Sequence, residues 1–404
     1  MTLELEEGQT VTVRFDQVAP RGDGIASEGL SKPIYASGVI PGEEARVRVR
    51  KVRRNYVAVE VEEITKPSEA RVTPPCPLFG GCSGCQFQHV AYPRQLELKR
   101  DMVRAQLQKF GGFDDPPVAP VIGADDPWNY RNQARFTVRD GKLGYVRRFK
   151  RRFFEVPECK IMDSRINAVL AKLQGNLQGA TQCNVRVGAD EDQVMIQPKL
   201  DLSAFGLESG QTHITERLHG REFLVAASAF FQVNRRQAEK LADVVAAQVQ
   251  GDPDTVVADA YAGVGTFAAL LAGSVAKVIA IEESAPAIEA AKQALAGLDN
   301  VELICARAEL LLPTLDQKVD VVVLDPPRSG CLPEALAAVA EFRPRRVIYV
   351  SCDPASLGRD LATLCGEDGA FDLVGVQPVD MFPQTQHVEC VATLDLRPTS
   401  SKVE

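Results

Sequence analysis

The chain has 404 residues, of which 45% are hydrophobic and 25% are charged, and its formal net charge is −8. A chain of this length predicts two or three domains rather than one hydrophobic core. It has no apolar run of about 18 residues, and the segment after Met1 is acidic, so we expect neither a membrane span nor a secretory leader. These features predict a cytoplasmic protein, and a monomer is the simplest expectation for its assembly.

Residues 1–65 are expected to form a small β-domain. Hydrophobic and polar residues alternate over 10–15, 44–50 and 56–61, which is the period of half-buried strands. About five short strands at this spacing favour an OB-like barrel, a fold that often binds oligonucleotides. A purely structural barrel is the alternative.

Positive charge is concentrated in two short runs despite the negative net charge. The runs comprise Arg46, Arg48, Arg50, Lys51, Arg53 and Arg54, and then Arg147, Arg148, Lys150, Arg151 and Arg152. Local stripes of this kind can bind phosphate groups, so both runs favour an RNA partner. A solvated charged face is the alternative interpretation.

Residues 66–234 are expected to form a central domain. It begins with a cysteine-rich loop, and an apolar stripe through Leu96, Met102, Val103 and Leu107 then predicts a helix over 93–110. Short alternating segments between 118 and 228 indicate further β-structure, although they do not specify its fold.

From residue 235 to residue 404, helical patterns alternate with nearly continuous runs of Val and Ile. Expected strands cover 255–259, 277–282, 320–325 and 346–351, and expected helices cover 235–249 and 285–296. Such runs indicate a parallel sheet that is buried on both faces, so we predict a doubly wound, Rossmann-like α/β domain. The last strand, 388–396, alternates polar and apolar residues and is expected to lie antiparallel at an edge.

A glycine loop follows the first of these strands and precedes a helix. It reads Asp259-Ala260-Tyr261-Ala262-Gly263-Val264-Gly265-Thr266 and lets the backbone approach a ligand, while Glu282 at the next strand end is suited to accept ribose hydroxyl groups. Nicotinamide dehydrogenases share this pattern, and an ordinary glycine-rich turn is a further alternative. A single Gly-x-Gly and the acidic Asp259 favour the cationic S-adenosylmethionine over a pyrophosphate. Asp325, followed by two prolines, is a candidate at the same sheet edge.

Cys352 is the candidate nucleophile because it closes the strand 346–351 at this edge. A thiolate there can add to carbon 6 of a pyrimidine and turn the ring into an enolate that attacks an activated methyl group. Cysteine is both a strong nucleophile and a good leaving group, although a buried structural cysteine is the alternative. The carbon-5 proton then requires a base, and residue type alone leaves Glu389 and His387 open.

At these residues the chain resembles the RNA uridine-5 methyltransferases, which form 5-methyluridine in ribosomal and transfer RNA. The resemblance rests on Phe231-Gln232-Val233-Asn234, the loop 259–266, Asp325-Pro326-Pro327-Arg328, the segment 350–354 and the run 382–389. The N-terminal β-domain resembles the TRAM domain, an RNA-binding module of the OB type. The implied fold is therefore a class I methyltransferase domain behind a TRAM domain and a central β-rich domain.

The resemblance implies a role for each matching residue. It makes Cys352 the nucleophile and Glu389 the base, and the residues it places around S-adenosylmethionine are Gln232, Tyr261, Glu282 and Asp325. It favours 23S ribosomal RNA as substrate, with transfer RNA as the alternative. A cytosine-5 methyltransferase and a non-catalytic RNA-binding protein are more distant alternatives.

Four further cysteines have the character of a metal site. They are Cys76, Cys82, Cys85 and Cys159. Cysteines of a cytosolic chain are not expected to form disulfides, and three clustered thiols with one remote thiol suit an iron–sulfur cluster better than zinc, which usually shows two close pairs. Family members with this pattern bind a 4Fe–4S cluster, so the resemblance strengthens this expectation. The expected role of the cluster is structural or in RNA binding.

Overall fold

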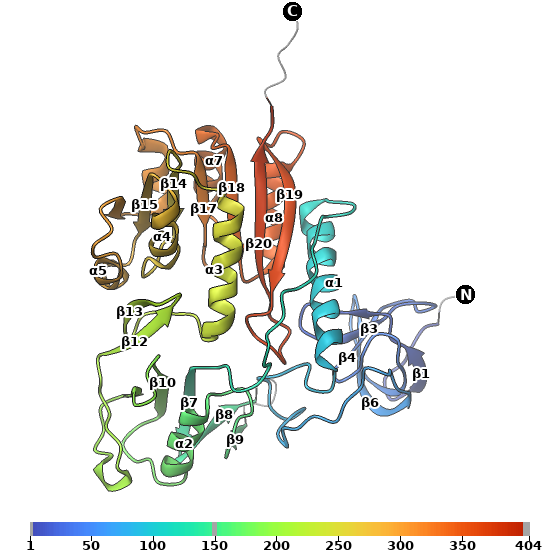
Figure 1. The fold of residues 1–404 in the computed structure, drawn as a ribbon. Coiled ribbons are helices and arrows are strands. Elements are labelled where there is room, and N and C mark those ends of the chain that lie inside the picture. The colour runs from blue at the N-terminus through green and yellow to red at the C-terminus, as the bar shows by residue number, and fades with distance from the viewer. Residues whose placement is uncertain (1–2, 148–151, 399–404) are drawn as a thin grey trace, which may run out of the picture.

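The computed structural model describes residues 3–147 and 152–398 (Figure 1). Six strands near the N-terminus form one sheet in the order β1-β5-β6-β4-β3-β2. They are β1 (Thr10–Arg14), β2 (Gln17–Val18), β3 (Gly24–Ala26), β4 (Ile34–Ala36), β5 (Glu44–Val52) and β6 (Val57–Lys66). Alternate residues of β5, namely Ala45, Val47 and Val49, are buried in the core of this part, as the sequence period predicts.

The first basic run lies on the outer face of this sheet and is partly neutralised there. Arg46 pairs with Glu63 at 3.0 Å and Arg48 with Glu62 at 2.6 Å. Arg50 pairs with Glu60. These glutamates belong to the neighbouring strand β6. The three arginines therefore pair with carboxylates, which reduces the positive charge available to bind phosphate groups. In the second run Arg148, Lys150 and Arg151 lie outside the described residues.

A five-stranded antiparallel sheet forms the central part of the molecule. Its order is β11-β10-β7-β8-β9, and α2 (Ser164–Leu173) packs on it. The strands are β7 (Gln133–Arg139), β8 (Lys142–Val146), β9 (Phe153–Glu155), β10 (Gln182–Val187) and β11 (Val194–Gln197). The short 3-10 helix η1 (Ser203–Phe205) and the hairpin of β12 (His213–Leu218) and β13 (Arg221–Ala226) then lead to the C-terminal part.

The C-terminal part contains a seven-stranded sheet in the order β16-β15-β14-β17-β18-β20-β19. Its strands are β14 (Val256–Ala260), β15 (Lys277–Glu282), β16 (Val301–Cys305), β17 (Val321–Leu324), β18 (Arg346–Ser351), β19 (Phe371–Val379) and β20 (Glu389–Leu396). The pairs from β16 to β18 are all parallel. Buried Val257 and Ala258, consecutive in β14, belong to different cores, so both faces of the sheet are covered. The predicted doubly wound domain is confirmed.

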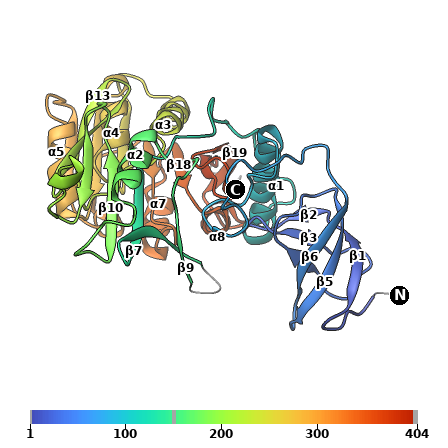
Figure 2. The ribbon, with the colours of Figure 1, turned by 90° about the horizontal axis from the view of Figure 1, so that it is seen from below.

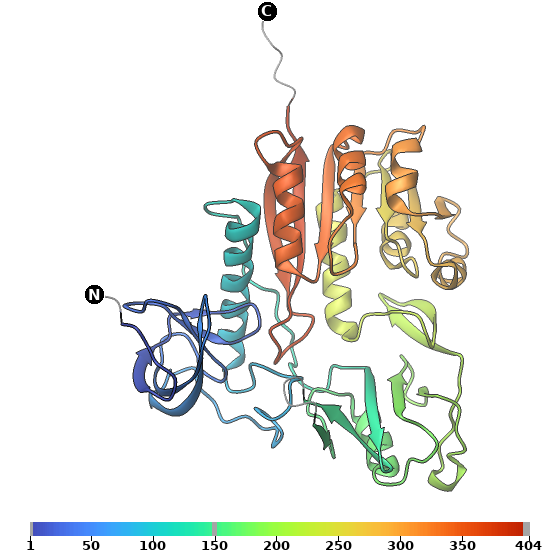
Figure 3. The same cartoon turned by 180° about the vertical axis from the view of Figure 1, so that it is seen from behind.

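Helices cover the two faces of this sheet. One face carries α3 (Arg235–Val249), α4 (Thr266–Leu271) with the 3-10 turn η2 (Ala272–Ser274), and α5 (Ala285–Ala294). The other carries α6 (Ala308–Leu311) with η3 (Leu312–Thr314), α7 (Pro333–Phe342) and α8 (Pro354–Cys365). Figure 3 shows α7 and α8 in front of the strands, with α3 on the far side.

The last strand is antiparallel, as expected, but the prediction that it forms an edge is wrong. β20 lies between β18 and β19 and pairs antiparallel with both. The edge strand is β19, which the sequence pattern did not reveal because its alternation is broken by a register shift before Gly375 and by Pro378. An interior position explains why the first six residues of β20 are buried.

The helix predicted over 93–110 is α1 (Tyr92–Gly111), and its partner is the C-terminal sheet rather than the central one. It packs against α8, and Val103 and Leu107 belong to the same core as α7 and α8. The strand segment after it adds to β19 through Val118 and Ile122. A central domain with bounds 66–234 would therefore contain α1, although this helix packs on the C-terminal part of the molecule. Figure 2 shows α1 between the N-terminal strands and the C-terminal sheet.

Within the part of the chain that the structure describes, no helix combines the length and apolar character needed to cross a bilayer.

Candidate active site

The predicted site residues gather at one edge of the C-terminal sheet. Parallel strands present their carboxyl ends together, and the order β15-β14-β17-β18 places four such ends side by side. Glu282 ends β15, the glycine loop follows β14, Asp325 follows β17 and Cys352 follows β18. The sheet topology therefore brings together residues that are up to 93 positions apart, from Asp259 to Cys352.

The glycine loop turns sharply between β14 and α4. Tyr261 and Gly263 have φ values of 66° and 57°, which lie in the left-handed region. Such a conformation is strained for a tyrosine, so other contacts must hold it. Glu282 supplies one of them, because its carboxylate accepts the Gly263 N–H at 2.9 Å; its other oxygen accepts the Ser284 N–H at 2.7 Å.

The carboxylates of Asp259, Asp325 and Glu282 lie near one another beside this loop. Asp259 is fully buried and one of its oxygens, Oδ2, accepts the Ala268 N–H at 2.9 Å, whereas Oδ1 has no partner among the described residues. Burial, and then the charge of Asp325, raise the pKa of Asp259 to about 8. Burial raises the pKa of Asp325 to about 7. A buried oxygen without a partner among acidic groups favours the binding of a cation at this place.

The segment that carries Gln232 is held by buried polar residues. Asn132 donates through Nδ2 to the Gln232 carbonyl at 3.3 Å, and Arg186 donates to the carbonyls of Ala229 at 3.3 Å and Phe231 at 3.4 Å. Gln232 itself is partly buried. Phe230 points outward and is 76% exposed, which is unusual for a ring of that size. The sequence analysis missed Phe230; the signal was an aromatic pair of which only Phe231 is buried.

Cys352 and Glu389 lie near each other, the first directly after β18 and the second at the start of β20. β18 and β20 pair antiparallel up to Ser351 and Cys390, and Cys352 and Glu389 are the neighbours of these two residues in the chain. Burial, followed by the charge of Glu389, raises the pKa of Cys352 to about 11. Burial, followed by Asp325, raises the pKa of Glu389 to about 8. The arrangement places a half-buried thiol near a carboxyl group whose pKa is close to neutral pH, as a general base requires.

Arg328 and His387 form the outer side of this pair. The Arg328 guanidinium lies 3.5 Å from His387 Nδ1 and 3.6 Å from a carboxylate oxygen of Asp353. Its positive charge partly opposes the rise in the pKa of both Cys352 and Glu389. Burial and the Arg328 charge lower the pKa of His387 to about 4. Of the two bases that the sequence left open, Glu389 faces the thiol and His387 faces a cation. Arg328 follows Asp325-Pro326-Pro327 in the sequence, and no local pattern there predicts its contact with His387.

The four predicted metal-ligand cysteines come near one another, although they do not close a site. Burial, together with the thiols of Cys159, Cys82 and Cys76, raises the pKa of Cys85 to about 12. The nearby Gln88 Oε1 and both ring nitrogens of His89 are buried without a partner among the described residues. Within residues 3–147 and 152–398, no group of three or more His, Cys, Asp or Glu side chains is spaced to hold a metal ion. The donor set, four soft thiols in mutual electrostatic range, still fits an iron–sulfur cluster or zinc.

Comparison with known proteins adds an independent line of evidence. The sequence profile of the tRNA (uracil-5-)-methyltransferase family matches residues 207–397, and that of the TRAM domain matches residues 4–63. An uncharacterized RNA methyltransferase of Gloeobacter violaceus is 35% identical and covers 97% of this chain and 97% of its own. A second from Thermosynechococcus vestitus is 33% identical and covers 96% of this chain and 98% of its own.

Among solved structures, the Pyrococcus abyssi tRNA (uracil-54, C5)-methyltransferase in complex with S-adenosyl-L-homocysteine has a TM-score of 0.74. It covers 96% of this chain and 100% of its own, at 23% identity. A likeness at that level of identity shows a shared fold across all three parts of the molecule.

Proposed function

Since the chain belongs to the RNA (uracil-5-)-methyltransferase family, we propose that it methylates carbon 5 of a uridine in 23S ribosomal RNA with S-adenosylmethionine as donor. The single observation that carries the chemistry is the proximity of Cys352 and Glu389 at the sheet edge, beside the carboxylates of the glycine loop. The charge of Glu389 acts directly on the Cys352 thiol, second only to burial.

The chemistry proceeds through a bond between the protein and the base. The Cys352 thiolate adds to carbon 6 of the uracil ring, and the electron pair moves onto the ring as an enolate. S-adenosylmethionine, when bound, supplies the methyl group that carbon 5 attacks. The Glu389 carboxylate then takes the proton from carbon 5, the carbon 5–carbon 6 double bond re-forms and the Cys352 thiolate leaves. Each step uses one of the two residues in a role that its position allows.

The donor pocket is proposed to use Gln232, Tyr261, Glu282 and Asp325. Each Glu282 oxygen already accepts one backbone N–H, and each retains a lone pair for a ribose hydroxyl group. Buried Asp259 and partly buried Asp325 provide negative charge on the side where a sulfonium cation is favoured. Both carboxyls have raised pKa values, so a cation that binds there is expected to promote their ionisation.

The test of the activity is a gel-stable complex with RNA that contains 5-fluorouridine. Fluorine at carbon 5 cannot be removed as a proton is, so the adduct with Cys352 should persist through denaturation. Ribosomal RNA is favoured because a TRAM domain and the cluster-type cysteines occur together. Transfer RNA is the second candidate, since the Pyrococcus abyssi relative of the same fold acts on it. Mapping 5-methyluridine in total RNA of a deletion strain distinguishes the two.

We also propose that Cys76, Cys82, Cys85 and Cys159 hold a 4Fe–4S cluster with a structural role, since the methyl transfer requires no electron. Replacing Cys85 with serine is expected to remove a broad visible absorbance from anaerobically purified protein, because thiolates are the ligands of such a cluster. The Cys305→Ser protein is the control, since that thiol is exposed and distant from the other four in sequence. A colourless wild-type protein that contains zinc contradicts the assignment.

Phe230 is proposed to stack on a base of the RNA. Alanine at this position is expected to raise the KM for RNA by about 5- to 150-fold, since stacking on an aromatic ring contributes about 1–3 kcal/mol. Tyrosine should preserve binding, and the affinity for S-adenosylmethionine should be unchanged in both variants. Steady-state kinetics with RNA and calorimetry with the donor measure the two effects. An unaltered KM in the alanine variant rules out the contact.

A further inference from the structure

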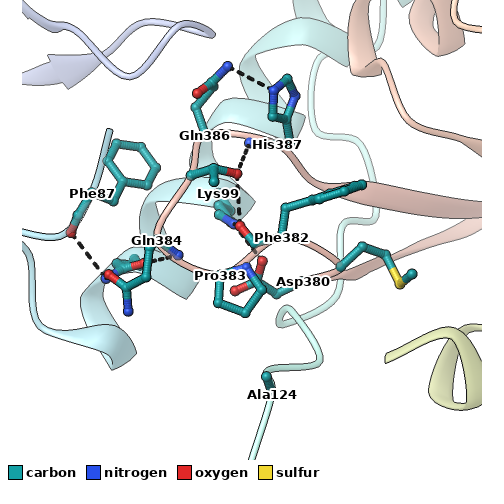
Figure 4. A network of polar contacts seen from close by, with 12 residues as sticks. Phe87, Lys99, Ala124, Asp380, Phe382, Pro383, Gln384, Gln386 and His387 are labelled. Carbon is teal, nitrogen blue, oxygen red and sulfur yellow. Dashed lines mark hydrogen bonds and ion pairs between the residues drawn. The ribbon is translucent and has the colours of Figure 1, made fainter. Parts of the chain in front are cut away.

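The loop between β19 and β20 leads directly into Glu389, and its conformation depends on residues from outside it (Figure 4). Residues 380–388 form neither helix nor strand, and Gln384 has a φ of 70°, in the left-handed region. Yet Asp380, Gln384 and Thr385 are buried. A buried segment without secondary structure must have its backbone polar groups satisfied by other elements.

The first anchor is an ion pair that is sealed from solvent. Lys99 of α1 and Asp380 have side chains that are 0% exposed, and Lys99 Nζ lies 2.5 Å from Asp380 Oδ1. The same ammonium donates to the Phe382 carbonyl at 3.1 Å, and the Tyr92 hydroxyl donates to Asp380 Oδ2 at 2.9 Å. Both oxygens of the Asp380 carboxylate therefore have a hydrogen-bond partner, and α1 contacts the loop at Asp380 and at Phe382.

The second anchor is a reciprocal amide pair one turn earlier on α1. Gln95 Oε1 accepts the Gln384 N–H at 3.1 Å, and Gln95 Nε2 donates to Gln384 Oε1 at 2.9 Å. The N–H groups of Gln86 and Phe87 donate to the Gln384 carbonyl at 3.1 Å and 2.9 Å. Every hydrogen-bonding group of Gln384's backbone thus has a partner on α1 or on the loop that contains Cys85.

Buried polar contacts of this kind are not needed to attach α1 to the rest of the molecule. A buried ion pair is often no more stable than apolar side chains of the same volume, and α1 already buries Leu98, Met102, Val103 and Leu107. A polar pair does, however, require one geometry where apolar packing tolerates several. That selectivity matters here, since a shift of one residue at the start of β20 turns Glu389 to the opposite face, away from Cys352.

We propose that Tyr92, Gln95 and Lys99, through Asp380 and Gln384, are positioning residues for the base Glu389, and we name these five the loop clamp. The proposal rests on the proposed function, in which Glu389 removes the carbon-5 proton. The clamp is expected to act on the elimination step, because none of the hydrogen bonds that the described residues of the clamp form reaches Cys352, which lies between β18 and α8. A loosened clamp leaves the adduct able to form but slow to resolve.

The experiment compares the two steps in the double variant Lys99→Met/Asp380→Asn, which removes both charges so that neither remains buried and unpaired. We expect adduct formation with 5-fluorouridine RNA to stay within about threefold of wild type, because that reaction stops before the base acts. Turnover on ordinary RNA should fall by about 10- to 100-fold, the cost of a small misplacement of a catalytic group, and a covalent complex should accumulate.

Lys109→Met is the matched control, since Lys109 is an exposed lysine in the last turn of the same helix. Tyr92→Phe removes the hydrogen bond to Asp380 and the one accepted from the Ala124 N–H without touching a charge. It replaces the double variant if that protein does not fold; a smaller fall in turnover with the same trapped complex is then expected. Unchanged turnover, or an equal loss in both steps, overturns the clamp while leaving the proposed function intact. A wild-type protein that forms no adduct overturns the proposed function itself.

Discussion

Alanine in place of Cys352 is expected to abolish methylation, with turnover lowered by roughly 10⁴-fold or more, as when other enzymes lose a covalent nucleophile. The adduct with 5-fluorouridine RNA should disappear as well, because the substitution removes the thiol that lies beside Glu389. Binding of S-adenosylmethionine should persist, since the pocket around Asp259 is unchanged. Methyl incorporation from labelled donor and a denaturing gel provide the two measurements.

The matched control is Cys305→Ala, which removes an exposed thiol at the end of β16. It should retain wild-type turnover and adduct formation. A Cys352→Ala protein that still forms the adduct would show that the sulfur is not the attacking atom and would end the proposed mechanism.

Because the pKa of Cys352 is raised, the rate of adduct formation is expected to increase with pH. Burial and the Glu389 charge bring that pKa to about 11, so the thiol is almost entirely protonated at neutral pH. The thiolate fraction rises about tenfold for each pH unit below the pKa, and the rate of adduct formation should rise with it between about pH 7 and pH 9. A rate that is flat over this interval contradicts the raised pKa in the enzyme–RNA complex.

The variant Glu389→Gln is expected to trap the RNA on the protein. Glutamine preserves the size of the side chain but cannot take the carbon-5 proton, so addition and methyl transfer proceed while elimination stalls. Turnover should fall by about 10²- to 10⁴-fold, the range for loss of a general base. The trapped species is measured as a methylated, covalent RNA–protein complex on a denaturing gel and by mass spectrometry.

The pH dependence separates Glu389 from its rival. Burial and the Asp325 charge raise the pKa of Glu389 to about 8, and only the carboxylate form can accept the proton. Elimination in wild type should therefore slow as the pH falls below about 8, and this dependence should vanish in Glu389→Gln. His387→Gln is the comparison, because the pKa of that ring is lowered to about 4 and it faces Arg328. Trapping by the His387 variant but not by the Glu389 variant would reverse the assignment.

The basic residues of the N-terminal sheet carry less weight for RNA binding than the sequence suggests. Arg46, Arg48 and Arg50 alternate with buried residues on β5 and therefore share its outer face, where the glutamates of β6 meet them. Exposed pairs of this kind contribute little to stability, but they do reduce the free positive charge that a phosphate encounters. The acidic partners are separated from the arginines by a turn, so a count of positive residues along the chain does not reveal them.

Much of the catalytic domain follows from the sequence alone. The predicted bounds of α3, β15 and β18 agree with the structure, because a helical or strand period and unbroken Val and Ile runs are properties of neighbouring residues. The order of strands in a doubly wound sheet then places Glu282, Asp325 and Cys352 at one edge, since parallel strands must end together. Local pattern was sufficient wherever the relevant contacts are local.

The rest was decided by contacts between distant segments. Cys352 faces Glu389 because β20 lies beside β18, whereas the sequence pattern placed that strand at an edge. Lys99 meets Asp380 across 281 positions, and on its own the lysine would be assigned to a solvated face of α1. A single sequence encodes periodicity directly but strand register and buried ion pairs only through the whole packed structure, because their free energy depends on which groups lose water together.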